Sequence, residues 1–371
     1  MISNSRQECK ITLLIDSLRG GGAERVCVTL ANSLKQNGWN VELLVLNLKD
    51  AVLQDDLSRD IAIKDLKVNH ARTAIFKLAM HLKNSRPTKI LVFNYELAIL
   101  LVILKKILSL QLKIFSRNIN TLSQKIADQK SIWHKHIVDI LVKLFYRKVD
   151  KLIAQSQGMK KDLVKNYAID EARISVIPNP LSSRIEKVAW KLDFNSVEKE
   201  DYLLCVGRLE SAKAFHYAIE AFSIVAKHHP TIRLKIVGQG SLENALKDRA
   251  QVLGVAGRVD FEGFQNDMVS YYLHARATVL TSLYEGLPNV LIESIALGTP
   301  VVAFDCPSGP SEIIVDGENG FLVEHLNVKA LADRLIEVVN NNPFDQDTVR
   351  VSACKFKSDR IFTQYERVLC V

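Results

Sequence analysis

The sequence lacks the signatures of several classes of protein. Its six cysteines are scattered over 371 residues without a C-x-x-C pair, so we expect neither a zinc site nor a disulfide framework. No run of about 18 uncharged apolar residues occurs, which predicts that no segment spans a membrane. The first residues, MISNSRQECK, hold no apolar stretch of the kind found in secretory signals. These absences favour a protein of the reducing cytoplasm.

Metal-binding patterns are missing as well. Histidines and carboxylates do not cluster at metal-ligand spacing in the sequence, which predicts that the protein uses neither a metal ion nor another cofactor. The chain does have ample apolar content, at 48% of its residues. A chain of this length with this composition is expected to form two domains, each with its own core.

Positive charge is concentrated in one part of the chain. Residues 97–151 contain eleven Lys and Arg against three Asp, a net charge of +8 that equals the net charge of the whole chain. Such a segment implies a phosphate-rich partner: nucleic acid, an anionic membrane surface or a lipid diphosphate. The very apolar part, residues 97–112, is either a buried helix or a helix lying partly in a membrane interface.

Residues 133–151 have the pattern of an amphipathic helix. Its apolar side consists of Ile137, Ile140, Leu141, Leu144 and Phe145, and its basic residues are Lys135, Lys143, Arg147 and Lys148. This pattern favours a helix lying on anionic lipid, and the alternative is a surface helix with a solvated basic face. Nucleic acid is the weaker partner because the segment has an apolar face and few aromatic side chains for base stacking.

The chain begins with a strand–turn–helix–strand pattern. Apolar runs at residues 10–17 and 41–48 flank Gly20-Gly21-Gly22 and a helical segment that ends at Asn37-Gly38. This is a βαβ unit with a phosphate-binding type of loop. A nicotinamide or flavin site is disfavoured because Arg25 replaces the third glycine and no acid closes the second strand. A glycine-rich turn without a ligand is the structural alternative.

Strand and helix patterns alternate along most of the chain, with glycine turns at strand ends, and a polar stretch at residues 181–200 is the best linker. We therefore predict an α/β protein with two Rossmann-like domains facing a cleft. The predicted domains are residues 1–185 and 186–345, followed by a helical tail at 346–371.

The segment TSLYEGLPNVLIESIALGTP, residues 281–300, places Glu285 in a loop after a strand and Glu293 in the following helix. Arg208 and Lys213 follow an earlier strand and are suited to phosphate oxygens. Helices starting after Gly240 and Pro288 offer backbone donors to the same group. Two carboxylates that can bind hydroxyls on either side of a diphosphate match the layout of a nucleotide sugar.

These segments resemble those of glycosyltransferase family 4, the retaining GT-B transferases also called group 1. The resemblance covers nearly the whole chain, through GGGAE at residues 20–24, VIPNPL, VGRLESAK, IVGQGSLE, FEGF, YEGLPNVLIESIALGTPVVA, GPSEII and ENGFLV. Among family members, the GPSEII loop and the GGAER start are most similar to enzymes that build O-antigen, capsule and undecaprenyl-linked oligosaccharides.

The resemblance implies an acceptor domain at residues 1–185, a nucleotide-sugar-binding domain at 186–345 and a C-terminal helix that crosses back to the first domain. It also implies roles for particular residues. Glu285 is expected to bind hydroxyls of the donor sugar, and Glu293 the ribose. Arg208 and Lys213 are expected to hold the diphosphate, and Phe264 to border the base pocket with Arg258 near it. The implied catalytic residues are Glu285, Arg208 and Lys213; the implied donor-binding residues are Glu293, Gly207, Gly238, Gly240, Phe264, Gly286, Leu287, Pro288 and Asn289; the implied first-domain residues are Gly21, Gly22, Glu24 and Arg117.

The sequence departs from the family pattern at two places. Ala214 follows the lysine where members usually have glycine, and we expect little loss because a small residue is kept. Many members have a histidine after the strand ending at Ser116, where this chain has Arg117 and Asn118. This departure leaves no histidine for that role and makes Arg117 the candidate in its place.

The resemblance implies retaining, metal-independent transfer of a hexose-type sugar from a UDP-sugar to a saccharide, in O-antigen, lipopolysaccharide, capsule or exopolysaccharide synthesis. The acceptor is expected to be linked to a lipid diphosphate, and the enzyme to be peripheral on the cytoplasmic face of the inner membrane. The alternatives are a GT-B sugar-nucleotide epimerase, a sugar phosphorylase and an inactive membrane-associated scaffold.

Overall fold

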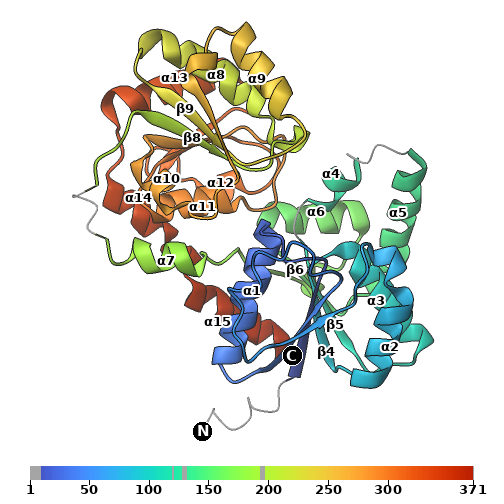
Figure 1. Ribbon diagram of the computed structural model, residues 1–371. Coiled ribbons are helices and arrows are strands. Elements are labelled where there is room, and N and C mark those ends of the chain that lie inside the picture. Colours follow the sequence, from blue (N-terminus) through green and yellow to red (C-terminus); the bar gives the residue numbers. More distant parts are fainter. Residues whose placement is uncertain (1–9, 119–120, 128–131, 193–196, 371) are drawn as a thin grey trace. The chain divides into compact units, whose positions relative to one another are not determined.

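The computed structural model describes residues 10–118, 121–127, 132–192 and 197–370, with the backbone alone at residues 125 and 132–136. The chain forms two compact units, shown in Figure 1. The first unit comprises Met1–Ser182 and Asp359–Val371, and the second comprises Ser183–Ser358. The first division lies close to the one predicted after residue 185. The tail is shared, because residues 346–358 pack with the second unit and only the last helix belongs to the first.

The first unit is built on a seven-stranded parallel sheet with the order β3-β2-β1-β4-β5-β6-β7. Its inner strands are buried on both faces, which explains their continuous apolar runs in the sequence. The strands are β1 (Lys10–Ile15), β2 (Asn40–Val45), β3 (Ala62–Asp65), β4 (Lys89–Val92), β5 (Lys113–Arg117), β6 (Lys151–Ala154) and β7 (Ile174–Val176).

Helices cover both faces of this sheet. They are α1 (Gly22–Gln36), α2 (Ile75–Ser85), α3 (Tyr95–Ile107), α4 (Leu122–Ala127), α5 (Ile132–Leu144), α6 (Gln157–Tyr167) and α15 (Ser358–Leu369). One core contains side chains of α1 and α15, and the other contains side chains of α2, α3, α5 and α6. Leu13 and Leu14, neighbours on β1, belong to different cores, as the alternation of side chains along a strand requires. The predicted return of the C-terminal helix to the first unit is confirmed.

The structure settles two open points of the sequence. The apolar segment 97–112 forms most of α3, whose Leu97, Ala98 and Leu101 are fully buried, so it is a core helix rather than an interfacial one. The predicted linker 181–200 is wrong in part, because residues 183–189 form α7 (Ser183–Ala189) and bury Ile185 and Ala189.

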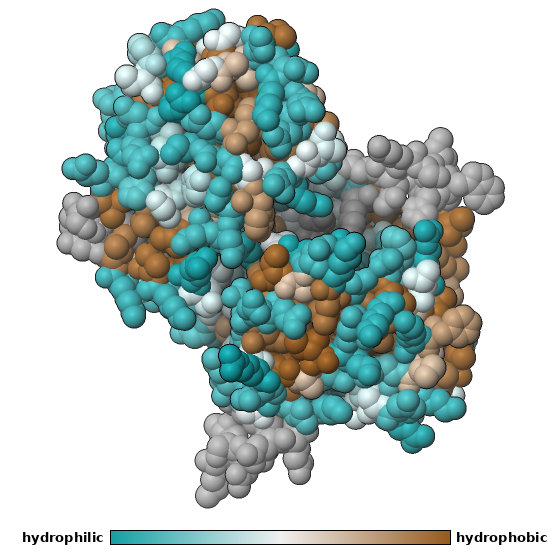
Figure 2. Space-filling model, in the orientation of Figure 1, coloured by the Kyte–Doolittle hydropathy of each residue, from teal (hydrophilic) through white to brown (hydrophobic). Residues whose placement is uncertain are grey.

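The amphipathic segment forms α5 over residues 132–144, followed by a short 3-10 helix and β6. Val138 and Val142 are buried, whereas Ile137, Ile140 and Leu144 are 45%, 54% and 54% exposed. Apolar surface is visible along the right-hand edge of the first unit in Figure 2, where Figure 1 places α5. Within the part of the chain that the structure describes, no helix has both the length and the apolarity to cross a bilayer.

The second unit is built on a six-stranded parallel sheet with the order β10-β9-β8-β11-β12-β13. The strands are β8 (Tyr202–Val206), β9 (Arg233–Val237), β10 (Val259–Gly263), β11 (Ala277–Leu280), β12 (Val301–Phe304) and β13 (Gly320–Val323). The helices besides α7 are α8 (Phe215–His228), α9 (Glu243–Val252), α10 (Val269–His274), α11 (Asn289–Ala296), α12 (Pro310–Ile313), α13 (Val328–Asn341) and α14 (Gln346–Ser352). Both sheets have Rossmann-like topology, so the predicted fold class is confirmed.

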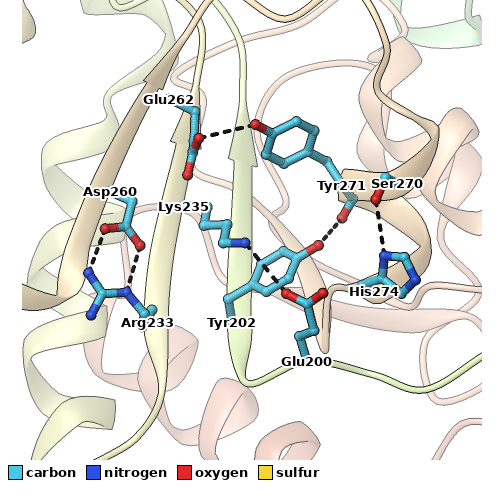
Figure 3. A network of polar contacts seen from close by, with 9 residues as sticks. All are labelled: Glu200, Tyr202, Arg233, Lys235, Asp260, Glu262, Ser270, Tyr271 and His274. Atoms are coloured by element: carbon cyan, nitrogen blue, oxygen red, sulfur yellow. Dashed lines mark hydrogen bonds and ion pairs between the residues drawn. The ribbon is translucent and has the colours of Figure 1, made fainter.

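A polar network lies across β8, β9 and β10 of the second unit (Figure 3). Arg233 forms a two-point ion pair with Asp260, with distances of 2.5 and 2.7 Å, and these bonds lower the pKa of the aspartate. The Tyr271 hydroxyl of α10 donates to Glu262 at 3.1 Å. This network ties α10 to the sheet.

Candidate functional site

The candidate site of the second unit lies where the order of its strands reverses. The chain runs from β8 to β9 and β10 on one side and then returns to β11 on the other side of β8. In open parallel sheets, ligands bind beyond the carboxyl ends of the two strands that flank such a point. Lys213 follows β8 and Glu285 follows β11, so two of the predicted catalytic residues meet at this point.

Lys213 and Glu285 form an ion pair in which Lys213 Nζ lies 2.5 Å from Glu285 Oε1. The fully buried Ser282 also donates its hydroxyl to this oxygen, at 2.6 Å. Glu285 itself is only 8% exposed. Two donors on one oxygen fix the carboxylate in place, so that it is presented as an oriented acceptor for hydroxyl groups.

Backbone contacts hold the two loops that carry this pair. The Leu283 amide donates to the Ala212 carbonyl at 2.9 Å, and the Thr281 hydroxyl lies 3.1 and 3.2 Å from the carbonyls of Lys213 and Ala214. Ala214 has a left-handed φ of 46°. That conformation explains why a glycine suits the position. The alanine adopts it here, so the departure from the family pattern leaves the loop geometry intact.

A third loop, after β12, braces the Glu285 segment. The Glu285 amide donates to the Pro307 carbonyl at 3.2 Å, and the Ser308 hydroxyl donates to the Gly286 carbonyl at 3.0 Å. Cys306 of this loop is buried, and burial together with the charge of Glu285 raises the pKa of its thiol. The Cys306 thiol is therefore neutral and acts as part of the wall beside Glu285.

Glu293 lies on α11 and is 8% exposed. Its Oε2 accepts a hydrogen bond of 3.1 Å from the hydroxyl of Tyr272, a fully buried residue of α10. The Tyr272 carbonyl in turn accepts from the Thr299 hydroxyl at 2.6 Å. Glu293 is thus held by a side chain from another helix. Neither Ser282 nor Tyr272 was identified from the sequence; Ser282 lies in the same loop motif, but nothing in the pattern pointed to Tyr272.

The remaining predicted donor-binding residues surround these carboxylates to different degrees. Gly286, Leu287 and Pro288 are buried just before α11, and Asn289 is the first residue of that helix. Arg208 follows β8 and is exposed. Within the described ranges, its guanidinium has neither a hydrogen-bond nor an ion-pair partner, so it is available for a phosphate.

Gly238 and Gly240 serve close packing of backbone. A Cβ on Gly238 would lie 1.9 Å from the Gly207 carbonyl oxygen, and one on Gly240 would lie 2.4 Å from the Leu209 carbonyl oxygen. Backbone hydrogen bonds join the same loops, including Leu209 N–H to the Gln239 carbonyl at 3.0 Å. The two glycines let the loops after β8 and β9 run side by side, which positions Arg208.

The start of α9 differs from the expectation of free backbone donors. The Glu210 carboxylate accepts from the Ser241 amide at 3.1 Å and from the Ser241 hydroxyl at 3.0 Å. One backbone donor just ahead of α9, the Ser241 amide, is therefore used by a carboxylate of the chain rather than left to face a phosphate. Glutamate favours this place because the helix dipole is positive there.

Phe264 and Arg258 lie at opposite ends of β10. Phe264 follows the strand at its carboxyl end and is 47% exposed, as suits a residue that stacks on a ligand. Arg258 precedes the strand, and its Nη1 donates to three carbonyls at the end of α8, those of Ala226, His229 and Pro230. The five-residue strand, about 17 Å long, lies between the two positions, so the structure does not bring Arg258 to Phe264.

The first-domain residues lie in the other unit. Gly21 is the N-cap of α1, Gly22 is its first residue, and Glu24 follows in the first turn. The Ser17 hydroxyl donates to Glu24 Oε1 at 3.2 Å. The glutamate is therefore tied back to the end of β1 across the glycine loop.

Arg117 at the end of β5 is only 1% exposed. Its Nε donates to the Tyr365 hydroxyl of α15 at 2.8 Å, its Nη2 donates to Asn179, and its guanidinium lies 5.6 Å from the centroid of the Phe93 ring. In this arrangement the side chain joins β5 to the C-terminal helix. The proposal that it takes the place of the family's histidine would require it to leave these contacts.

In the part of the chain that the structure describes, no three His, Cys, Asp or Glu side chains are grouped so as to hold a metal ion. The side chains of His134 and His136 lie outside the described ones.

Comparison with known proteins defines the class of this protein. The structure of HepE from Anabaena, solved with UDP-glucose, superposes with a TM-score of 0.79 at 19% identity, over 97% of this chain and 99% of that one. The fold is that of the GT-B enzymes. Residues 20–183 match the family described as Glycosyltransferase Family 4, and residues 187–352 match Glycosyl transferases group 1. The chain belongs to this family and is a glycosyltransferase.

Two curated relatives match over most of their length. One is the N-acetylgalactosamine-N,N'-diacetylbacillosaminyl-diphospho-undecaprenol 4-alpha-N-acetylgalactosaminyltransferase of Campylobacter jejuni, which is 28% identical over 325 residues, 85% of this chain and 86% of that protein. The other is the amylovoran biosynthesis glycosyltransferase AmsD of Erwinia amylovora, which is 25% identical over 333 residues, 89% and 90% of the two chains.

Proposed function

We propose that this glycosyltransferase moves a hexose-type sugar from a UDP-sugar to a saccharide carried on a lipid diphosphate, with retention of anomeric configuration. Its product would enter a bacterial cell-surface polysaccharide such as O-antigen, capsule or exopolysaccharide. The UDP-glucose bound to HepE supports the donor class. The names of the Campylobacter and Erwinia relatives support the acceptor class and the pathway class.

The observation that carries the proposal is the ion pair of Lys213 and Glu285 at the strand reversal, with the exposed Arg208 on the same loop as Lys213. Glu285 accepts hydrogen bonds from hydroxyls of the donor sugar. Lys213 and Arg208 hold the diphosphate. Glu293, one to two turns into α11, accepts hydrogen bonds from the ribose. The site thus contacts the sugar, the diphosphate and the ribose of a nucleotide sugar.

The reaction breaks the bond between the anomeric carbon and the diphosphate oxygen and forms a bond to the acceptor oxygen on the same face of the sugar. The departing diphosphate oxygen takes the proton of the acceptor hydroxyl. Lys213 and Arg208 stabilise the charge that develops on this oxygen, the kind of contact that lowers a barrier most. These two cations perform the task that a metal ion has in other transferases, so we propose that transfer is metal-independent.

The acceptor places the enzyme at a membrane. On α5, the apolar side chains of Ile137, Ile140 and Leu144 are exposed, whereas the opposite side of the helix packs in the core. Lys143, Arg147 and Lys148 are exposed beside them. An apolar strip flanked by cations suits the cytoplasmic face of an inner membrane that contains anionic lipid.

The test of the site is substitution of Glu285 and Lys213. Glu285→Ala and Lys213→Ala are expected to lower kcat about 100-fold or more, because each removes a contact to the reacting sugar or its leaving group. Glu262→Ala is the matched control, since this glutamate also accepts a hydrogen bond from a neighbour but lies in the network of Figure 3. Near-normal transfer by either alanine variant at matched solubility would overturn the proposed site.

Product analysis decides between transfer and the rival reactions. A transferase releases UDP only when an acceptor is present, and NMR of its product shows the anomeric configuration of the donor. A sugar-nucleotide epimerase would convert the donor without an acceptor, and a phosphorylase would require inorganic phosphate. Unchanged transfer in EDTA is expected, and loss of transfer that added Mg²⁺ restores would contradict metal independence.

A further inference from the structure

Besides α5, the helix α2 of the first unit exposes large apolar side chains together with cations. The described residues expose thirteen large apolar side chains, and seven of them lie on α2, α3 and α5. They are Ile75, Phe76 and Met80 on α2, Ile107 at the end of α3, and Ile137, Ile140 and Leu144 on α5. Phe76 is 83% exposed and Met80 is 65% exposed. Such a concentration on one layer of helices marks an interaction surface.

The exposed sides of α2 and α5 point away from the same face of the sheet. Leu78 and Leu82 of α2 are buried in the same core as Val138 and Val142 of α5. The helix α3 belongs to this core as well, and it contacts both α5 and the 3-10 helix that leads into α2. Because each helix buries one side against this shared core, the opposite sides form the outer surface of one layer.

The segment of sequence that carries these helices is strongly cationic, which favours an anionic partner, although Arg117 within it is buried and adds nothing to the surface. Residues 66–151, which include all three helices, contain seventeen Lys and Arg against four Asp and Glu, a net charge of +13 in a chain of net +8. The rest of the chain therefore carries −5. No acidic residue occurs between positions 66 and 95, and Lys77 and Lys83 of α2 are exposed. A second copy of this surface would be repelled, whereas an anionic bilayer would be attracted.

We propose that α2 docks on anionic lipid together with α5, with Phe76 and Met80 inserted at the level of the acyl-chain boundary and Lys77 and Lys83 near lipid phosphates. The proposal rests on the function proposed above, in which the acceptor is linked to a lipid. A single short apolar strip gives weak and reversible membrane binding, and a second, basic and apolar contact strengthens it. Two contacts also fix the orientation of the first unit on the membrane, which one helix alone would leave free to rotate.

The experiment is vesicle sedimentation of the full chain with phosphatidylcholine vesicles, with and without phosphatidylglycerol. The test variant is Phe76→Ser with Met80→Ser. The matched control is Val252→Ser with Val351→Ser, which removes two exposed apolar side chains from the second unit. All four side chains are largely solvent-exposed, so both variants are expected to fold, and thermal unfolding checks this.

We expect the wild-type protein and the control to sediment only with the anionic vesicles. The test variant should partition about tenfold less, because it loses the burial of two large apolar side chains. Wild-type partitioning by the test variant would overturn the role of α2, and equal binding to neutral vesicles would overturn the charge argument. If the protein self-associates without lipid and the test variant abolishes this, the partner of the surface is a second copy of the chain and not a membrane.

The test is separable from the proposed function. UDP affinity measured by calorimetry reports on the second unit alone and should be equal in the wild type, the test variant and the control. Loss of vesicle binding with intact UDP binding supports the docking surface. A wild-type protein that sediments with anionic vesicles but does not bind UDP would defeat the proposed function and leave the docking surface standing.

Discussion

Removal of the buried Tyr272 hydroxyl should weaken UDP binding, because this hydroxyl holds Glu293, the proposed partner of the ribose. Tyr272→Phe deletes the donor that lies 3.1 Å from Glu293 Oε2 and keeps the ring, which is fully buried. A hydrogen bond to a charged group is worth about 1.5–3 kcal/mol, which corresponds to a roughly 10- to 150-fold change in affinity. Glu293 keeps other contacts, so we expect a loss at the lower end, about tenfold.

Calorimetry with UDP and with 2′,3′-dideoxy-UDP separates positioning from general damage. If Tyr272 orients Glu293 toward the ribose hydroxyls, Tyr272→Phe weakens UDP but leaves the dideoxy compound unchanged. Tyr271→Phe is the matched control, because its hydroxyl also donates to a glutamate at 3.1 Å, in the network of Figure 3. Equal weakening of both nucleotides, or of neither, would refute the positioning role.

Three further predictions concern stability and are measured by chemical denaturation. Burial and the nearby charge of Arg276 lower the pKa of Lys199 to about 7. Between pH 7 and 10 the unfolded state therefore binds more protons than the folded state, so the stability relative to Lys199→Met should rise by up to about 1.4 kcal/mol per pH unit. A stability difference that does not change with pH would contradict the shift. Tyr365→Phe removes the acceptor of Arg117 Nε and should cost about 2 kcal/mol, with faster hydrogen exchange in α15; unchanged exchange would show that this bond does not hold the helix. Gly238→Ala would place Cβ 1.9 Å from the Gly207 carbonyl oxygen and should cost at least about 3 kcal/mol, whereas Gly254→Ala, with open space around it but a strained φ, should cost about 1 kcal/mol.

The fold was predictable from the sequence where strands are buried on both faces. Parallel strands with both faces covered appear as short apolar runs, so β8, β9, β12 and β13 could be located almost to the residue. The strand β3 has no such signal, because it is an edge strand of four residues that alternates exposed and half-buried positions. The helix α2 is not indicated by the sequence either, because exposed apolar residues blur its periodicity.

The candidate site was predictable in its residue types but not in its contacts. The loop positions of Glu285 and Lys213 followed from the strands before them, yet they are 72 positions apart, and only the strand order brings them together. The same holds for Tyr272 and Glu293, which lie on different helices. The Glu210 contact with Ser241 also depends on the pairing of β8 with β9, which spacing along the chain does not reveal.

One measurement tests the central claim most directly: UDP release from a panel of UDP-sugars, with and without a bacterial membrane lipid extract as acceptor. The proposed function predicts release from one or a few UDP-sugars that depends on the extract, with sugar recovered in a lipid-extractable product, and loss of both signals in Glu285→Ala. Release that is independent of the acceptor, or equal in Glu285→Ala, would contradict the proposed transfer at this site.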